Sequence, residues 1–330
     1  MSMLILKPGM LSTFQDLGRV GQQHLGVSVA GAMDLRAHQL ANLLVGNDPG
    51  LATLEITLTG PTIRFTKPCC LALCGADLSA TLNGQPLALN RPIVVRAKDE
   101  LGFGMRQHGT RVYLAVHGGF ALTPVLGSTS TYLRSAIGGW QGRALRRDDE
   151  IPLLRPLKNK ALEELAMDLW SFKIYLPGAL AESHQSVVRL IKGQQWSEFT
   201  PESCAALLTE SYRISPDSER MGYRLQGAPI LMTTPRQMIS EGTTFGTVQV
   251  PSGGQPIILM ADRQTTGGYP KMAYVASIDL PRLAQMGPGD MASFKAISLE
   301  QAQALDLTRA QAFATLAQTL QPVRTLLLNH

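Results

Sequence analysis

The sequence predicts a mainly β protein built from two related β domains, with a few helices. The chain has 330 residues, more than the roughly 250–300 at which a single core stops growing, so two domains are expected. Most segments are short and β-branched or alternating, and turn residues interrupt them every ten residues or so. A weak internal repeat relates the two halves of the chain.

The expected strands are bounded by Gly, Pro, Asn or Asp. Turns at this spacing are typical of β barrels or sandwiches and argue against parallel βαβ units. The dipeptide Asn83-Gly84 predicts a tight hairpin turn. The expected strands cover residues 54–60, 61–66, 70–75, 79–89, 92–97, 111–119, 256–261 and 291–298.

The first expected helix covers residues 33–46, where leucines recur near helical spacing, and a second covers residues 161–170. Asp34 is a plausible N-cap of the first helix and Gly46 a plausible C-cap. These two helices interrupt an otherwise strand-rich pattern.

A third helix is expected at the C-terminus. Ser298 and Gln301 form a capping box. Thr308 and Gln311 repeat that spacing and predict a second helix start. The C-terminal domain is therefore expected to end in helical structure.

The repeat has the form strand, Gly-Gly-aromatic, then a serine nine residues beyond the second glycine. It runs from Gly119 to Ser128 in the first half and from Gly268 to Ser277 in the second. It predicts an N-terminal domain at residues 1–160 and a C-terminal domain at 161–330.

Composition excludes several classes of protein. With 45% hydrophobic and 17% charged residues the chain is expected to be globular, and no run reaches the ~18 apolar residues of a membrane span. The net charge of +5 is scattered and aromatics are only 6%, so nucleic-acid binding is not expected. The four cysteines suit a reduced, cytoplasmic compartment, and no ligand spacing predicts a metal site.

The segment "ADRQTTGGYPKMAY", residues 261–274, is the first candidate site. Its hydroxyl pair, Thr265 and Thr266, precedes Gly267 and Gly268. Glycines let backbone N–H groups approach an anion closely, although a Walker loop would need a lysine and a following helix. A plain tight turn is the alternative, and both interpretations stay open.

Two carboxylates stand out nearby. Asp262 ends an apolar strand, and Glu241 lies between a strand-like segment and a Gly-rich turn. A carboxylate so placed could take a proton, order an amide or bind a metal. Each could equally cap a turn or pair with an arginine.

Two long polar loops complete the candidates. Residues 13–34 carry Asp16, Arg19 and Asp34 without a clear period, and such loops are often functional, although Asp16 and Arg19 could form a structural ion pair. Residues 211–227 offer Arg220, whose guanidinium suits a carboxylate or phosphate unless it is merely solvated. No lysine lies in the Ala-Met-Lys-Met pattern of a biotinylated hairpin, so no covalent biotin is expected on this chain.

Several segments together resemble one family, the biotin-dependent carboxyltransferase-like or allophanate-hydrolase subunit 2-like proteins. They include "TFQDLGRVGQQHLGV", "GAMD", "LEITLTGP", "LGSTSTY", "YRISPDSERMGYRL", "SEGTTFGTVQVPSGGQPIILMADRQTTGGYP" and "DLPRLAQMGPGD", and they run from about residue 7 to 295. The resemblance implies a pair of cyclophilin-like β barrels. One departure is visible at residues 146–149, Arg-Arg-Asp-Asp where relatives usually have Arg-Arg-Gly-Asp; it is expected to alter a turn only.

The resemblance also implies a function. Free-standing members of this length are C components of an ATP-dependent 5-oxoprolinase, which opens 5-oxo-L-proline to L-glutamate together with a directly bound B component and an A component. ATP with Mg²⁺ would be the cofactor, bound by this chain or by its partner. The alternatives are a regulatory protein that captures an inhibitor of a sensor kinase, and a carboxyltransferase acting on urea or a related amide with a separate biotin carrier.

The residues carried over from the family motifs fall into two groups. The expected catalytic residues are Asp262, Glu241 and Asp16. The expected substrate-binding residues are Arg19, Asp34, Arg220, Gln249, Thr265, Thr266, Gly267, Gly268 and Tyr269.

Overall fold

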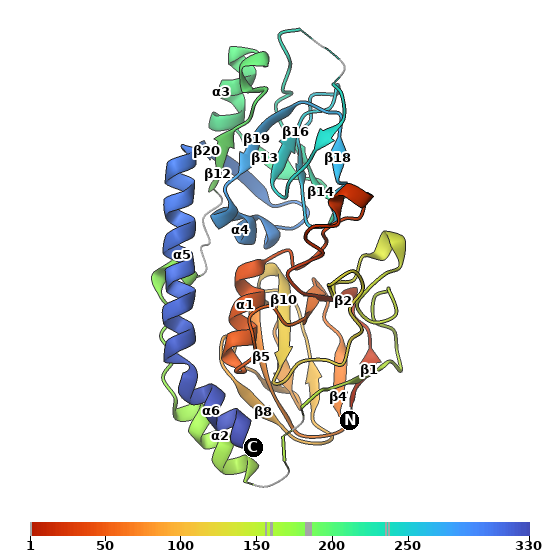
Figure 1. The fold of residues 1–330 in the computed structure, drawn as a ribbon, viewed down its shortest axis with the longest axis vertical. Coiled ribbons are helices and arrows are strands. Elements are labelled where there is room, and N and C mark those ends of the chain that lie inside the picture. Colours follow the sequence, from red (N-terminus) through yellow and green to blue (C-terminus); the bar gives the residue numbers. More distant parts are fainter. Residues whose placement is uncertain (1, 156, 159–160, 182–186, 235, 237) are drawn as a thin grey trace. The chain divides into compact units, whose positions relative to one another are not determined.

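The computed structural model describes residues 2–330 except 156, 159–160, 182–186, 235 and 237, and Figure 1 shows its ribbon. The chain forms two compact units, the first from Met1–Arg19, Asp34–Ala181 and Ala312–His330, the second from Val20–Met33 and Glu182–Gln311. Neither unit is continuous in sequence, unlike the expected domains 1–160 and 161–330. The expected boundary itself falls at Lys160, which lies outside the described residues.

The first unit contains two antiparallel sheets. The larger has the order β11-β1-β4-β9-β6-β7 and the smaller β2-β3-β10-β5-β8. The strands of the larger sheet are β1 (Ser2–Lys7), β4 (Thr62–Phe65), β6 (Thr81–Leu82), β7 (Gln85–Pro86), β9 (Glu100–Gly102) and β11 (Glu150–Pro152). Those of the smaller are β2 (Leu11–Gln15), β3 (Thr53–Thr57), β5 (Cys69–Asp77), β8 (Ile93–Val95) and β10 (His108–Val116).

The two sheets share one core. Met3 and Phe65 from the larger sheet lie in the same buried cluster as Phe14 and Leu114 from the smaller. Alternate residues of β3 and β10, such as Glu55 and Tyr113, are polar and also buried. Because successive side chains of a strand point to opposite faces, the face of the smaller sheet turned away from this core carries the polar side chains of β3 and β10, together with small apolar residues of β5, and it is buried too.

The second unit is a closed barrel of the order β12-β19-β16-β17-β14-β13-β20. Its core includes Val188, Leu225, Val248 and Met272. The strands are β12 (Val187–Lys192), β13 (Ser211–Ile214), β14 (Gly222–Gln226), β16 (Thr247–Gln249), β17 (Ile257–Leu259), β19 (Lys271–Val275) and β20 (Met291–Ala296). A separate two-stranded ribbon pairs β15 (Glu241–Gly242) with β18 (Thr266–Gly267). The mainly β prediction is confirmed, and every expected strand overlaps an observed one.

The local turn and cap signals are mostly confirmed. The Asp34 carboxylate accepts a hydrogen bond from the Ala37 backbone N–H at the start of α1, and Ser298 and Gln301 form both bonds of their capping box. Asn83 and Gly84 have the positive φ angles of a primed turn. The helices are α1 (Leu35–Leu44), α2 (Leu162–Ser171), α3 (Pro201–Thr209), α4 (Leu280–Ala284), α5 (Leu299–Thr319) and α6 (Gln321–Asn329), with 3₁₀ turns at Gln23–Leu25, Leu133–Ser135, Gly178–Leu180, Trp196–Glu198 and Ser277–Asp279.

The helix start expected at Thr308 is wrong. The Thr308 hydroxyl donates back to the Ala304 carbonyl inside a continuous α5. A threonine in that position satisfies its hydroxyl within the helix and need not begin a new one. The break comes instead at Leu320, where Pro322 occupies the first turn of α6.

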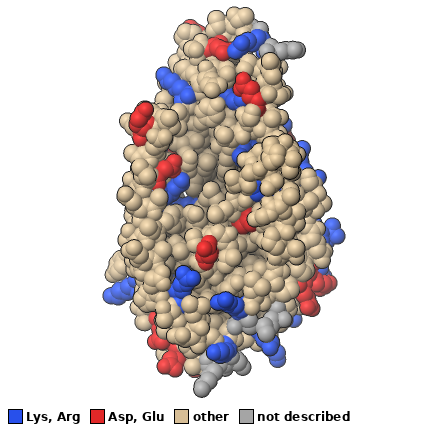
Figure 2. Space-filling model, viewed as in Figure 1, with Lys and Arg blue, Asp and Glu red and all other residues tan. Residues whose placement is uncertain are grey.

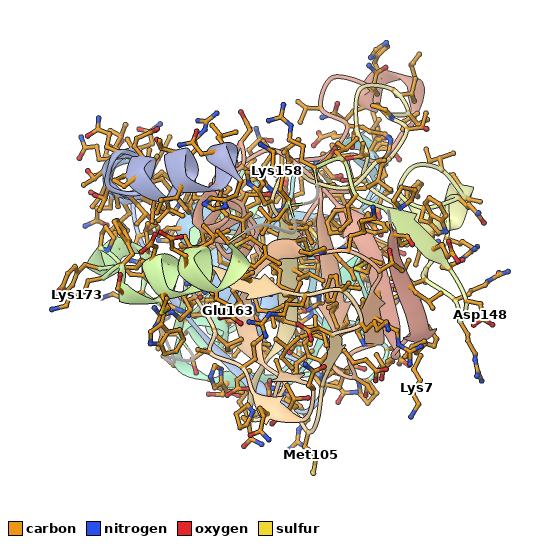
Figure 3. The ribbon with its side chains drawn as sticks, turned by 90° about the horizontal axis from the view of Figure 1, so that it is seen from below. Lys7, Met105, Asp148, Lys158, Glu163 and Lys173 are labelled. Atoms are coloured by element: carbon orange, nitrogen blue, oxygen red, sulfur yellow. The ribbon has the colours of Figure 1, made fainter. Side chains whose placement is uncertain are left out.

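The departure at residues 146–149 has a local backbone consequence. Asp148 adopts a φ of +65°, the left-handed region that glycine enters without a Cβ clash. Its side chain is 81% exposed and projects into solvent in Figure 3. Asp149 closes the turn by accepting hydrogen bonds from Arg143 and from the Arg146 backbone. The substitution therefore strains a surface turn of the first unit.

Candidate functional site

The Asp16 carboxylate is the centre of a hydrogen-bond cluster in the first unit. It accepts bonds from the hydroxyls of Ser128 (2.6 Å), Ser130 (2.5 Å) and Thr129 (2.9 Å) and from the backbone N–H groups of Thr129 (2.6 Å) and Gly18 (2.8 Å). Burial alone would raise the pKa of Asp16, but these bonds outweigh it and the pKa is lowered. Asp16 is thus an ionised anchor for the loop at 128–130.

Arg19 binds backbone carbonyl groups of the same loop and of the residues just before it. Its guanidinium donates to the carbonyl of Val125 at 3.1 Å and to that of Ser130. Only 1% of Arg19 is exposed. Asp16 and Arg19 therefore meet on one loop, with the carboxylate holding its hydroxyls and N–H groups while the guanidinium holds its carbonyls.

Asp34 belongs to a second polar cluster, between α1 and the smaller sheet. Besides capping α1, its backbone N–H donates to the Tyr113 hydroxyl at 2.7 Å, and that hydroxyl donates to Glu55 at 2.8 Å. His38 of α1 contacts Thr53 through Nδ1 at 2.8 Å, and burial lowers the pKa of His38 to about 4. Glu55, Tyr113 and His38 were not expected from the sequence. For Glu55 and Tyr113 the available signal was a polar residue at alternate positions of an apolar strand.

Asp262 and Arg220 form a buried ion pair in the second unit. The guanidinium donates to both carboxylate oxygens, at 3.0 and 2.9 Å, and also to the Gly31 carbonyl at 2.6 Å. Nearby, the Ser28 hydroxyl donates to the Arg263 carbonyl at 3.0 Å. These contacts fasten the segment 20–33 to the barrel. With both oxygens bound, Asp262 is arranged as an ion-pair partner, and its catalytic role stays a prediction.

Glu241 takes part in a different ion pair. It accepts a hydrogen bond of 2.7 Å from the ammonium of Lys271, the first residue of β19. The hydrogen bond and charge of Lys271 lower the pKa of Glu241. The lysine side chain is 5% exposed and the glutamate side chain 47% exposed. Lys271 was not among the expected site residues, and no short pattern marks it, because lysine is mostly exposed and its burial here depends on a partner 30 residues away.

The residues of the Thr-Thr-Gly-Gly-Tyr motif form the ribbon beside this pair. Thr266 and Gly267 make up β18, and the Thr265 carbonyl accepts from the Thr243 backbone at 2.9 Å. A Cβ added at Gly267 would lie 2.6 Å from Nε2 of Gln249. The ribbon thus approaches the Gln249 amide closely at Gly267, where a larger residue would displace the end of that side chain.

The remaining motif residues lie at the end of the ribbon. A Cβ on Gly268 would meet the Met238 carbonyl at 3.2 Å. Tyr269 is 49% exposed. Together, Lys271, Gln249 and the ribbon offer a buried positive charge and amide donors beside a solvent-exposed carboxylate, which is chemistry suited to an anionic or carbonyl oxygen.

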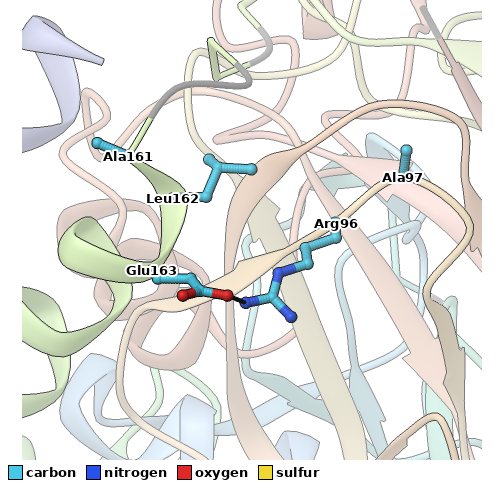
Figure 4. Close-up of a pocket in the computed structure, with 5 residues that line it drawn as sticks. All are labelled: Arg96, Ala97, Ala161, Leu162 and Glu163. Atoms are coloured by element: carbon cyan, nitrogen blue, oxygen red, sulfur yellow. Dashed lines mark hydrogen bonds and ion pairs between the residues drawn. The ribbon is translucent and has the colours of Figure 1, made fainter.

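A surface pocket of about 540 Å³ lies elsewhere, on the first unit. Figure 4 shows that it is lined by Arg96, Ala97, Ala161, Leu162 and Glu163, with Arg96 and Glu163 joined at 3.1 Å. Both charged side chains are largely exposed. An exposed pair of this kind contributes about 0–1 kcal/mol to stability, and none of the expected site residues lies there.

Charge and metal chemistry add little to the choice of site. On the face in Figure 2, basic and acidic side chains of the coloured residues are interspersed. Within the described part of the chain, no three His, Cys, Asp or Glu side chains gather in a way that could hold a metal ion. None of the described helices has the length and apolar character to cross a membrane.

Comparison with known proteins shows a family and relatives that match most of this chain. The model of the carboxyltransferase domain, subdomain A and B, matches residues 25–296. The chain is 40% identical to the C component of 5-oxoprolinase from Escherichia coli over 90% of this chain and 92% of that protein. It is 36% identical to the protein of the same name from Haemophilus influenzae, over 89% and 91% of the two chains.

A solved structure supports the fold. The Kluyveromyces lactis urea carboxylase superposes with a TM-score of 0.86 at 28% identity, covering 96% of this chain and 29% of that one. Urea amidolyase of Lachancea kluyveri is 31% identical over 94% of this chain, which spans 18% of that protein. The same fold therefore occurs both as a chain of this length and as part of much larger proteins.

Proposed function

This chain belongs to the carboxyltransferase domain family, subdomain A and B, and from that membership we propose that it is the C component of an ATP-dependent 5-oxoprolinase. The observation that carries the proposal is the 40% identity to the C component of a bacterial 5-oxoprolinase over nine-tenths of both chains. Both units contribute to that match, since it extends over residues of each.

In this proposal the chain acts in a complex with the A and B components of the enzyme, and it binds the B component directly. The complex opens the lactam of 5-oxo-L-proline to L-glutamate at the expense of ATP and Mg²⁺. Activation consists of phosphoryl transfer from ATP to the lactam oxygen, which releases ADP. Water then adds to the activated carbon, and the C–N bond breaks as its nitrogen takes up a proton. A second water hydrolyses the resulting acyl phosphate to the carboxylate and inorganic phosphate. The part assigned to this chain is binding and orienting the substrate.

Two side chains on β16 and β19 suit that part. A substrate with one carboxylate and one lactam carbonyl needs a cation and neutral donors, and Lys271 and Gln249 supply both from adjacent strands. Asp16 and Arg220 instead hold loops and are expected to act by positioning. Mixing this chain with its A and B components tests the proposal through the ATP-dependent formation of glutamate.

A second candidate is a carboxyltransferase acting on urea or a related amide, because urea amidolyase is 31% identical over 94% of the chain. That reaction needs a carboxybiotin donor carried by another protein. Incubation with a biotinylated carrier, its carboxylase, bicarbonate and urea distinguishes the two. Transfer of labelled carboxylate to urea would favour the second candidate, and its absence alongside glutamate formation favours the first.

A further inference from the structure

The Lys271 ammonium is buried where a free charge would be costly. Its side chain is 5% exposed, and its backbone N–H is tied to the Gln195 side chain at 3.1 Å. Lysine is almost never buried to this degree without a partner. Among the described residues, the partner of the ammonium is Glu241. An ammonium has three donors, so one carboxylate oxygen at 2.7 Å leaves capacity for more.

Gln249 lies opposite Lys271. The β16–β19 ladder shifts register between Val248 and Gln249 so that Gln249 pairs with Lys271. Such irregularities re-aim side chains and occur next to binding sites. Gln249 is 1% exposed, and its Nε2 has no hydrogen-bond partner among the described residues. An amide left unsatisfied in this way destabilises the fold unless a ligand or solvent molecule completes it.

Glu241 is attached to this pair by a weak element. Its strand, β15, has two residues and pairs only with the two residues of β18 in the described ladder. A two-stranded ribbon is marginally stable by itself. Because Glu241 is half exposed, its carboxylate can move into water when another carboxylate takes its place, and the buried ammonium then keeps a counter-ion throughout.

We propose that Lys271 and Gln249 form a subsite for the carboxylate of a small molecule, and that the Glu241 carboxylate occupies this subsite until the ligand displaces it. The inference rests on the proposed function only in choosing 5-oxo-L-proline as the carboxylate to test. A single ammonium with amide donors matches the single charge of a carboxylate. A phosphate would call for more positive charge than these side chains supply.

The test is calorimetric titration of the full chain with three probes: 5-oxo-L-proline, 2-pyrrolidinone, which has the same lactam without the carboxylate, and inorganic phosphate. We expect 5-oxo-L-proline to bind and the other two to bind at least tenfold more weakly. Lys271→Met should weaken 5-oxo-L-proline binding at least thirtyfold, and Gln249→Met about tenfold, the usual effect of one hydrogen bond to a charged group. Lys295→Met, an exposed lysine of β20, is the matched control and should change nothing.

The Glu241→Gln variant distinguishes a carboxylate that competes with the ligand from one that only forms a structural ion pair. Removing the competing carboxylate should tighten 5-oxo-L-proline binding about fivefold or more, whereas loss of a merely structural ion pair would weaken binding or leave it unchanged. Glu241 is on the surface, so this variant is informative even if Lys271→Met does not fold. Unchanged or weaker binding in Glu241→Gln, equal binding of 2-pyrrolidinone, or a preference for phosphate would overturn the inference.

The outcome is independent of the assay for the whole complex. If the three components form glutamate but Glu241→Gln and Lys271→Met bind 5-oxo-L-proline as the unmodified chain does, the proposed function stands and the subsite is wrong. If the titrations behave as expected but the complex forms no glutamate, the subsite stands and the proposed function is wrong.

Discussion

The Lys271 ammonium donates a hydrogen bond of 2.7 Å to Glu241, and the two side chains differ in burial: 5% of the lysine side chain is exposed and 47% of the glutamate side chain. In the Arg220–Asp262 pair of the same unit both side chains are buried, with 5% and 8% exposed. A pair buried on both sides is suited to holding structure, whereas a pair open on the anionic side is suited to exchange. Loss of the Arg220–Asp262 pair is therefore expected to lower stability, whereas loss of the Glu241 carboxylate is expected to change ligand binding.

Arg220→Met should destabilise the second unit by about 3–5 kcal/mol, because it leaves the Asp262 carboxylate buried without its counter-ion and releases the Gly31 carbonyl. Urea denaturation measures the loss. Arg64→Met is the matched control, since Arg64 pairs with Glu100 at the surface and should cost less than about 1 kcal/mol. Equal stability of the two variants would show that the Arg220–Asp262 pair is not structural.

Asp16→Asn should lower stability at pH 7 by about 1.5–3 kcal/mol, since hydrogen bonds to a charged group are weakened. The pKa of folded Asp16 is below its ordinary value of 3.8, so its contribution is present above that pH and is lost as the pH falls through the folded pKa. The difference in free energy of unfolding between the unmodified chain and Asp16→Asn should therefore become smaller below about pH 4.

A pH series of denaturation curves checks the Asp16 prediction. Asp217→Asn, which removes an exposed carboxylate, serves as the control and should run parallel to the unmodified chain. If the difference in free energy of unfolding between the unmodified chain and Asp16→Asn stays constant from about pH 7 to about pH 3, the charge of Asp16 does not hold the loop at 128–130.

Asp148→Gly should stabilise the protein by about 0.5–1 kcal/mol, because glycine adopts a φ of +65° without a Cβ penalty. The melting temperature would rise accordingly. Asp148→Ala removes the same charge but keeps the Cβ, so it should give no gain. A gain of equal size in both variants would point to charge, not backbone strain, as the cause.

The parts of the fold that depend on neighbouring residues were predictable. The Asp34 cap, the Ser298–Gln301 box and the Asn83-Gly84 turn each involve groups within a few residues, so short patterns identify them. The start predicted at Thr308 failed because the same residue types can bond backward within a helix.

The parts that depend on register were not predictable from one sequence. Asp16 meets Ser128 across 112 residues, and Lys271 meets Glu241 across 30. The pairing of Gln249 with Lys271 follows a register shift that no local pattern announces. The motif residues could be selected by resemblance, but whether each holds a loop or faces a ligand required the geometry.

The most direct test of the assigned function is glutamate formation from 5-oxo-L-proline by the three purified components, measured with ATP and Mg²⁺ and with each component omitted in turn. We predict ATP-dependent glutamate formation with the full set and its loss when this chain is left out. No glutamate from the complete, correctly folded set, or an unchanged rate without this chain, would contradict the assignment as the C component of a 5-oxoprolinase.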